Sequence, residues 1–235
     1  MFTVAALLFT STLLRQEPTP VLWFDLKGNV LVNGHSANAQ FNPGVGKVNT
    51  PDGLAYNFAG HKSGILLGDN AALRLTGSIA VSAWIYPRSY VNDGPGAQIL
   101  FRGDDRCGHD PYTLVIQGDG TINFGIQNDD DQGMAVKGEL PLNRWTHVLG
   151  SFNDQTGELA LWLNGREAYA HTVKRPFANL QPAFTPGVGV GNVQNDKGPH
   201  NQPFNGMLAD LRLYSQVITP NELGYSRAAA GGVQP

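Results

Sequence analysis

Cysteine, charge and helical periodicity are all scarce in this sequence. Cys107 is the only cysteine among 235 residues, so the chain can form no internal disulfide and carries no cysteine-rich zinc site. Only 15% of the residues are charged, and 16 basic residues against 19 acidic ones give a net charge of −3. No basic stripe is available to neutralise phosphates, which excludes a nucleic-acid-binding function.

The residue patterns of common catalytic sites are also missing. No run of alternating acids places two carboxylates on one strand face, as glycoside hydrolysis would require. Gly150-Ser151-Phe152 lacks the second glycine of a nucleophile elbow, and the six histidines are isolated from one another. The glutamates are scattered along the chain as Glu17, Glu139, Glu158, Glu167 and Glu222. We therefore predict that the chain is not an enzyme.

The clearest local pattern is a pair of β-hairpins between Arg144 and Val173. Apolar residues alternate with polar or small ones there, as in a strand that buries one face. The pair Asn164-Gly165 tolerates positive φ at both central positions of a type I′ turn. Three antiparallel strands are therefore expected, with three leucines facing a core: Leu159, Leu161 and Leu163.

Most of the remaining chain also favours strands. Residues 121–127 alternate in the same way and predict a second buried row, formed by Ile122, Phe124 and Ile126. A helix is expected only after Thr219, where Pro220 and Glu222 complete a capping box over two to three turns. The predicted fold is all-β: a two-sheet antiparallel jelly-roll sandwich with one short C-terminal helix.

Five short motifs, in their order along the chain, resemble the laminin-G-like jelly-roll domain of the concanavalin A-like lectin/glucanase superfamily. The resemblance covers residues 21–228 and implies one sandwich domain. The motifs are Phe58-Ala59-Gly60, Ser82-Ala83-Trp84-Ile85-Tyr86-Pro87, Trp145-Thr146-His147-Val148 with Phe152-Asn153-Asp154, Leu161-Trp162-Leu163-Asn164-Gly165, and Phe204-Asn205-Gly206 leading to Thr219-Pro220-Asn221-Glu222-Leu223.

The two ends of the chain differ in composition from this domain. Met1 to Leu14 is apolar but too short to span a bilayer, and it lacks the basic residues that open a secretory signal. Residues 1–20 are therefore expected to be either an apolar leader or a retained arm that docks on a partner or a membrane. Residues 229–235 are small and predict a flexible tail. With the resemblance, this organisation predicts an extracytoplasmic protein.

The resemblance also implies a structural calcium ion. In relatives of this fold, an acid of an early strand and an acid of the closing strand share one cation, and the matching residues are Asp25 and Asp210. Oxygen ligands of this kind suit calcium. The alternative is that both are ordinary surface acids of their strands.

Several polar loops follow strands and supply candidate ligand-binding residues. If the loops share one rim of the sandwich, their side chains would form a site for hydroxyl-rich glycans or calcium; otherwise they are solvated loops. The candidates are Asp104, Asp105, His109, Asp110, Asp130 and Asn195.

Trp162 is a further ligand-binding candidate because it alternates with Leu161 and Leu163. If these leucines point inward, the indole points outward, where it would stack on a sugar or pack under a partner. A loop or helix covering it would instead make it part of a second apolar layer.

Two functions remain after these exclusions. The first is a non-catalytic recognition module that binds glycans or a protein partner. The alternative is a structural subunit of an envelope or membrane assembly, docked through Met1 to Leu14 or through a sheet face.

Overall fold

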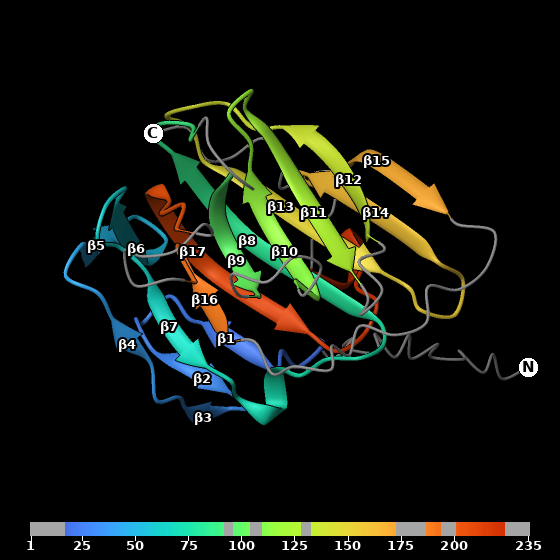
Figure 1. Ribbon diagram of the computed structural model, residues 1–235, viewed down its shortest axis with the longest axis horizontal. Coiled ribbons are helices and arrows are strands. Elements are labelled where there is room, and N and C mark those ends of the chain that lie inside the picture. The colour runs from blue at the N-terminus through green and yellow to red at the C-terminus, as the bar shows by residue number, and fades with distance from the viewer. Residues whose placement is uncertain are drawn as a thin grey trace, which may run out of the picture.

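The computed structural model describes residues 17–91, 96–103, 110–127, 133–172, 187–193 and 201–223. Strands β1 to β17 of this part of the chain form two stacked sheets, and all pairings between these strands are antiparallel (Figure 1). The predicted two-sheet sandwich is therefore confirmed. In the described residues, no helix is long and apolar enough to cross a membrane.

The larger sheet has ten strands. Its main path runs in the order β15-β14-β13-β8-β17-β1-β2-β3, while β6 pairs with β17 and β5 with β6. The strands are β1 Leu22–Phe24, β2 Val30–Val32, β3 His35–Ser36, β5 Val45–Thr50, β6 Gly53–Ala59, β8 Ile79–Pro87, β13 Thr146–Phe152, β14 Glu158–Leu163, β15 Arg166–Thr172 and β17 Asn205–Tyr214.

The smaller sheet has seven strands in the order β12-β11-β10-β9-β16-β7-β4. It lies over the larger sheet in the view of Figure 1. The strands are β4 Gln40–Phe41, β7 Ile65–Gly68, β9 Ala97–Arg102, β10 Tyr112–Ile116, β11 Thr121–Gln127, β12 Gly133–Glu139 and β16 Val188–Val190.

The two hairpins predicted around β14 are present. β14 pairs antiparallel with β13 on one side and with β15 on the other. Asn164 and Gly165 have φ values of 50° and 73°, the positive angles that a type I′ turn needs at both central positions. The Asn164 side chain also accepts a hydrogen bond of 3.0 Å from the backbone N–H of His147, which ties this turn to β13.

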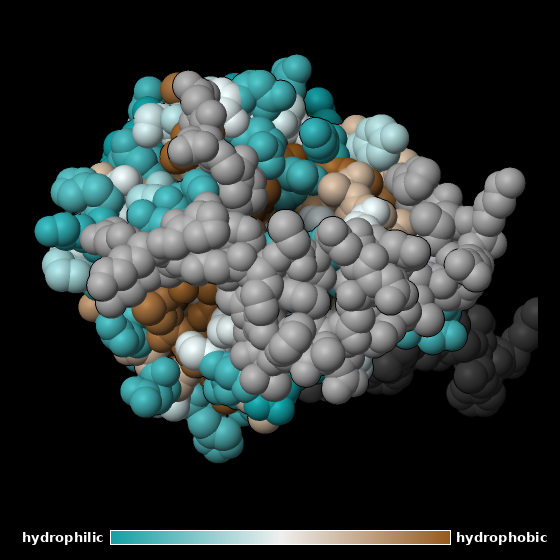
Figure 2. Space-filling view, in the orientation of Figure 1, coloured by the Kyte–Doolittle hydropathy of each residue, from teal (hydrophilic) through white to brown (hydrophobic). Residues whose placement is uncertain are grey.

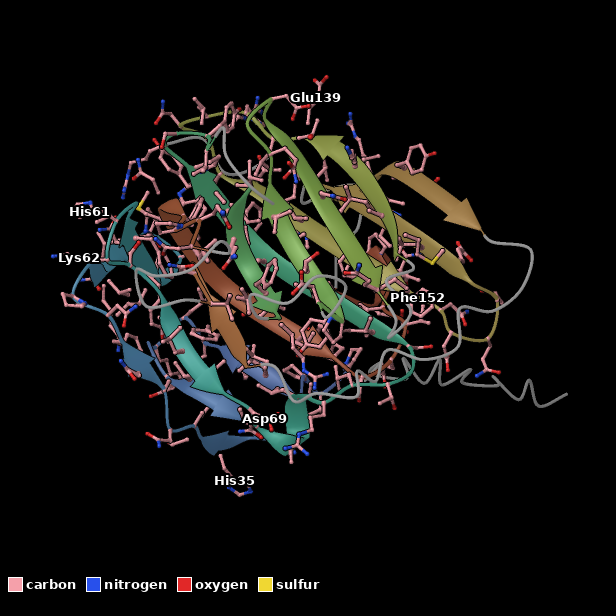
Figure 3. The ribbon with its side chains drawn as sticks, viewed as in Figure 1. His35, His61, Lys62, Asp69, Glu139 and Phe152 are labelled. Carbon is pink, nitrogen blue, oxygen red and sulfur yellow. The ribbon has the colours of Figure 1, made fainter. Side chains whose placement is uncertain are left out.

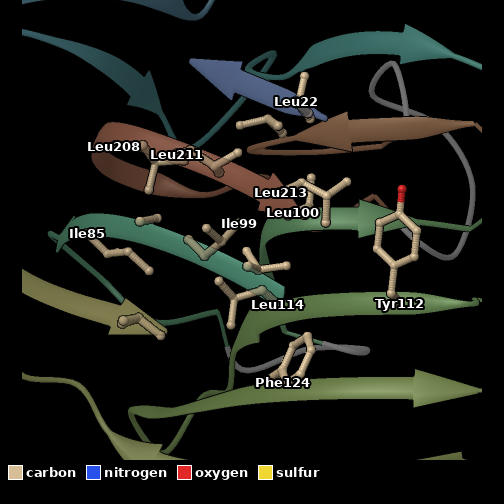
Figure 4. Close-up of a cluster of buried hydrophobic side chains, with 14 of the residues drawn as sticks. Leu22, Ile85, Ile99, Leu100, Tyr112, Leu114, Phe124, Leu208, Leu211 and Leu213 are labelled. Carbon is tan, nitrogen blue, oxygen red and sulfur yellow. The ribbon is translucent and has the colours of Figure 1, made fainter. Parts of the chain in front are cut away.

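The hydrophobic core lies between the two sheets (Figure 4). The two predicted rows face it from opposite sheets: Leu159 and Leu161 from β14, and Ile122, Phe124 and Ile126 from β11, are buried. Leu163 is partly buried and packs against the same cluster. The alternation therefore predicted the correct faces of both strands, and each buried leucine stabilises the sandwich by about 2–5 kcal/mol relative to alanine.

A bulge in β17 decides which of its residues face this core. The register with β8 shifts between Ala209 and Arg212, and Asp210 has a φ of 49°. An aspartate tolerates this left-handed conformation better than most residues. As a result Leu208 and Leu211, three residues apart, are both buried in the core, while Asp210 and Arg212 contact Trp23 on the outer face.

A second, smaller apolar cluster lies on the outer face of the ten-stranded sheet. The chain after β17 covers this region with Ile218 and then with a 3₁₀ turn, Pro220–Leu223. Trp162 packs against the cluster and is partly buried, as in the second of the two alternatives, while its role in ligand binding stays a prediction. The buried members are Ala80, Leu149, Tyr214 and Ile218, with Trp162 and Leu223 packed on them.

The 3₁₀ turn begins with the predicted capping contact. The backbone N–H and the hydroxyl of Thr219 each donate a hydrogen bond of 2.8 Å to the Glu222 carboxylate. The prediction of a helix of two to three turns is therefore corrected: the described residues form only this 3₁₀ turn, which ends at Leu223.

None of the four tryptophans of the chain belongs to the core between the sheets. All four are partly buried. Their neighbours in sequence or in register place them on the outer face of the ten-stranded sheet. They are Trp23, Trp84, Trp145 and Trp162.

Gly150 allows the two sheets to approach in the middle of the core. A Cβ at Gly150 would overlap the ring of Phe124 from the opposite sheet. We expect Gly150→Ala to lower the free energy of unfolding by about 1–3 kcal/mol, because a packed core resists extra atoms. Urea unfolding measures this change.

Gly46→Ala is the matched control for this variant. Gly46 lies on the exposed strand β5, and a Cβ there would meet nothing within 4 Å. Its effect should stay within about 0.5 kcal/mol. Equal losses in the two variants would contradict the close contact between Gly150 and Phe124.

Candidate functional site

A groove of about 400 Å³ lies on the outer face of the seven-stranded sheet. The inward residues of β10 and β11 fill the core, so the residues between them face outward and form the groove floor. Where described residues are visible on this face, hydrophobic residues lie next to hydrophilic ones (Figure 2). The groove is lined by Phe101, Asp110, Thr113, Val115, Gln117, Asn123, Gly125, Ile126, Gln127, Gly133, Met134 and Ala135.

Small residues give the groove its depth. Thr113, Gly125 and Ala135 are register partners on three adjacent strands and form one row across the floor. A Cβ at Gly125 would lie only 3.0 Å from the Thr113 hydroxyl oxygen, closer than ordinary packing allows. Glycine at position 125 therefore leaves the groove floor without a projecting side chain between Thr113 and Ala135.

The polar lining of the groove is dominated by amides. Asn123 Oδ1 is buried and accepts no hydrogen bond within the described part of the chain. A buried acceptor without a partner costs about 1–3 kcal/mol, so such atoms call for an explanation such as a ligand or a water molecule. Neither lysine nor arginine occurs among the described lining residues, so the groove offers amide, hydroxyl and carboxylate groups but no cation.

Only one of the loop candidates predicted from the sequence falls within the described residues. Asp110 lines the groove, and it lies so close to Gly103 that a side chain at position 103 would overlap its carboxylate. The other loop candidates lie outside the described residues and stay predictions: Asp104, Asp105, His109, Asp130 and Asn195.

The sequence analysis missed the amide residues of the groove. Asn123 and Gln127 occupy the polar positions of the alternating stretch 121–127, which identified them as outward-facing residues. Gln117 follows the neighbouring strand β10. The polar face of residues 121–127 was the one feature of the sequence that could have indicated these residues. Alternation alone, however, does not distinguish a binding face from a solvated one.

The carboxylate of Asp25 stabilises its own turn. Oδ1 accepts hydrogen bonds from the backbone N–H groups of Lys27 and Asn29 at 2.9 and 2.7 Å, and Oδ2 accepts one from the Asn29 side chain at 2.8 Å. Burial acts to raise the pKa of Asp25, but the hydrogen bonds from Asn29 and Lys27 outweigh it and hold the pKa below its ordinary value.

Asp210 has different partners. Its Oδ1 accepts hydrogen bonds from Trp23 Nε1 at 2.7 Å and from Arg212 Nε at 2.9 Å, while Oδ2 accepts one from Arg212 Nη2 at 2.8 Å. Although burial opposes the charged form of Arg212, Asp210 raises the pKa of this guanidinium above its usual value. A calcium ion at Asp210 would have to replace this fork-shaped ion pair.

This arrangement does not fit a calcium ion shared by Asp25 and Asp210. Both oxygens of each carboxylate already accept hydrogen bonds within the protein. Within the described ranges, no group of three or more acidic, histidine or cysteine residues is placed to hold a metal. Calcium binding by the chain stays a prediction, without an assigned site.

We expect Asp25→Asn to leave the effect of calcium and of a chelator on the melting temperature unchanged. An ion that Asp25 binds in the folded state alone would raise this temperature by mass action, and the substitution would remove that rise. Differential scanning calorimetry with calcium and then with EDTA measures this. A calcium-dependent rise in melting temperature that Asp25→Asn abolishes would support the shared site after all. Asp52→Asn is the control, because Asp52 lies on an exposed turn.

A buried histidine lies on the other sheet. His147 Nε2 and the Ser82 hydroxyl lie 2.9 Å apart on the neighbouring strands β13 and β8, and Trp84 contacts the imidazole edge-on. His147 and Ser82 are only 4% and 3% exposed, which keeps ligands away from them. Burial, with a smaller effect of Arg212, lowers the pKa of His147 to about 3.

The lowered pKa of His147 predicts loss of stability in acid. The unfolded chain takes up this proton as the pH falls through about 6.5, whereas the folded chain resists it down to the lower pKa. Stability contributed by neutral His147 is therefore complete above pH 6.5 and decreases below it, by at most about 1.4 kcal/mol per pH unit for one proton. Urea unfolding at several pH values measures this slope.

His147→Gln should make the slope shallower, since glutamine keeps a polar group near Ser82 but does not titrate in this range. His35→Gln is the control, because His35 is exposed on β3 and points away from the molecule in Figure 3. An unchanged slope in His147→Gln would contradict the buried neutral state.

Comparison with known proteins identifies the class of this domain. A family model described as the concanavalin A-like lectin/glucanases superfamily, of the laminin G type, matches residues 59–224. This match spans more than half of the chain. The chain therefore belongs to this family, as the sequence motifs predicted.

The curated relatives are distant. Jeltraxin of Lepidobatrachus laevis is 24% identical over 131 residues, which cover 49% of this chain and 56% of that protein. Pentraxin-related protein PTX3 of Homo sapiens is 23% identical over 111 residues, covering 44% of this chain and 28% of that protein. The matches thus span about half, or less, of the length of these relatives.

Solved structures share the fold. Domain 4 of AbnA, an extracellular arabinanase of Geobacillus stearothermophilus in complex with arabinotriose, superposes with a TM-score of 0.65 at 20% identity, covering 88% of this chain and 98% of that one. The binding domain of botulinum neurotoxin DC in complex with SialylT gives 0.64 at 14% identity, covering 87% and 50%. At these identities the likeness concerns the fold.

Proposed function

We propose that this domain is a non-catalytic recognition module that binds neutral glycans in the groove on the outer face of the seven-stranded sheet. The single observation that carries the proposal is the buried Oδ1 of Asn123, an acceptor on the groove lining with no partner among the described residues. A ligand hydroxyl donating to this atom would remove the cost of leaving it unpaired.

The chemistry of the lining favours hydroxyl-rich, uncharged ligands. Amide groups both donate and accept hydrogen bonds, as sugar hydroxyls do, and the outward side chains of Asn123, Gln117 and Gln127 carry such groups. A negatively charged sugar would find no cationic partner among the described lining residues, and it would meet the carboxylate of Asp110.

The same lining supports binding rather than hydrolysis. Glycosidases place two carboxyl groups on either side of the scissile bond. Asp110 is the single carboxylate among the described residues that line the groove. The described part of the groove therefore has an acceptor for a hydroxyl, but not the acid pair of a glucanase.

The comparisons support a glycan ligand and an extracytoplasmic location. The family is named for lectins and glucanases, and two proteins with this fold are described as complexes with arabinotriose and with SialylT. The first belongs to an extracellular enzyme. The alternative function is a structural subunit docked through Met1 to Leu14 or through a sheet face, and the first of these two surfaces lies outside the described residues.

Asn123→Ala tests the proposed function. We expect glycan affinity to fall at least about tenfold, because the ligand loses a hydrogen bond to a buried acceptor. The melting temperature should stay the same or rise, because Oδ1 has no partner to lose among the described residues. A glycan array with and without EDTA, followed by calorimetric titration of the best neutral ligand, measures both quantities.

Gln155→Ala, in the exposed turn between β13 and β14, is the matched amide control and should bind like the unmodified protein. Unchanged glycan binding by Asn123→Ala would overturn the assignment of the groove. Absence of any bound glycan on the array would overturn the proposed function itself.

A further inference from the structure

A second cavity of about 390 Å³ lies on the opposite side of the sandwich, on the outer face of the ten-stranded sheet. β1 and β2 form its floor, and the segment 17–20, which leads into β1, forms one wall. The size falls in the range of small-molecule sites. The cavity is lined by Glu17, Pro18, Thr19, Pro20, Trp23, Leu31, Gly34 and Arg212.

The indole on this floor is held in one orientation. Trp23 Nε1 donates a hydrogen bond of 2.7 Å to Asp210, and the guanidinium carbon of Arg212 lies 5.1 Å from the indole centroid. The bulge in β17 brings both of these partners to the outer face. A fixed aromatic surface loses little conformational entropy when a ligand binds to it.

One wall of the cavity is polar. Arg212 uses Nε and Nη2 to bind Asp210, while its Nη1 lies 3.6 Å from Glu17 Oε2, which is longer than a hydrogen bond. The Glu17 side chain is 67% exposed. Nη1 of Arg212 and the carboxylate of Glu17 therefore present a donor and an acceptor next to each other.

The charges of this wall restrict the ligand. One guanidinium stands beside two carboxylates, Asp210 and Glu17, so an anionic ligand would gain little from Arg212 and be repelled by the acids. Adjacent hydroxyl groups match the wall better, because one can donate to Glu17 while its neighbour accepts from Arg212.

We propose that this cavity is a second saccharide site, which takes one neutral sugar residue with two adjacent hydroxyl groups on Glu17 and Arg212. The apolar face of the sugar ring then lies against Trp23, Leu31 and Pro20. This site does not depend on the proposed function of the groove, because the two cavities share no lining residue and lie on different sheets. With both sites occupied, one domain holds two glycans on opposite faces.

The test uses the full chain with the Asn123→Ala substitution, so that binding in the groove is already weakened. The indole N–H signals of the ¹⁵N-labelled protein are recorded by NMR during titration with arabinose, galactose, glucose and mannose, and with galacturonic acid as the anionic probe. Trp23→Phe identifies the signal of Trp23. We expect at least one neutral sugar to move this signal, and galacturonic acid to bind more weakly than galactose.

Glu17→Ala should then raise the Kd of that sugar about tenfold without changing the melting temperature, since the side chain is largely exposed. Glu167→Ala removes a carboxylate from β15, at the other end of the same sheet, and should have no effect. The proposal is overturned if no neutral sugar moves the Trp23 signal, if galacturonic acid binds more tightly than galactose, or if Glu17→Ala binds as well as its parent. These outcomes are separate from the array result, which decides the groove.

Discussion

The bulge at Asp210 is the constraint on which much of the larger sheet depends. β17 pairs with β8, β1 and β6, so its geometry is shared by the middle of the sheet. The extra residue lets Leu208, Leu211 and Leu213 all face the core. In a regular strand, Leu208 and Leu211 would point to opposite faces because they are three residues apart. It also brings Asp210 and Arg212 onto Trp23. One local irregularity thus serves the packing on one face of β17 and the polar contacts on the other.

Local patterns were sufficient where local geometry determines the structure. The Asn164-Gly165 turn and the buried rows of β14 and β11 follow from alternation and from the φ preferences of two residues, so the sequence predicted them correctly. The same rule fails in β17, because alternation assumes one residue per register position. Only the pairing with β8, more than 100 residues away, reveals the bulge.

The candidate sites were harder to predict because they depend on partners distant in sequence. Asp25 and Asp210 looked alike as strand acids, yet the first binds its own turn and the second binds Arg212 and Trp23. The environment of Trp162 depends on the segment ending at Leu223, which packs on the same cluster and is distant in sequence. In the groove, the sequence predicted Asp110 as a candidate binding residue. The role of Asn123 was not predicted, because it depends on the row of small residues that neighbouring strands place beside it.

The placement of the aromatic residues has a spectroscopic consequence. The four tryptophans are partly exposed on the outer face of one sheet, whereas Tyr56 and Tyr112 are buried in the core between the sheets. Tryptophan emission from this protein therefore reports on the outer face of the larger sheet and not on the core between the sheets. Unfolding followed by tryptophan emission therefore observes the loss of structure on this outer face, whereas the tyrosines are divided between the core and the surface.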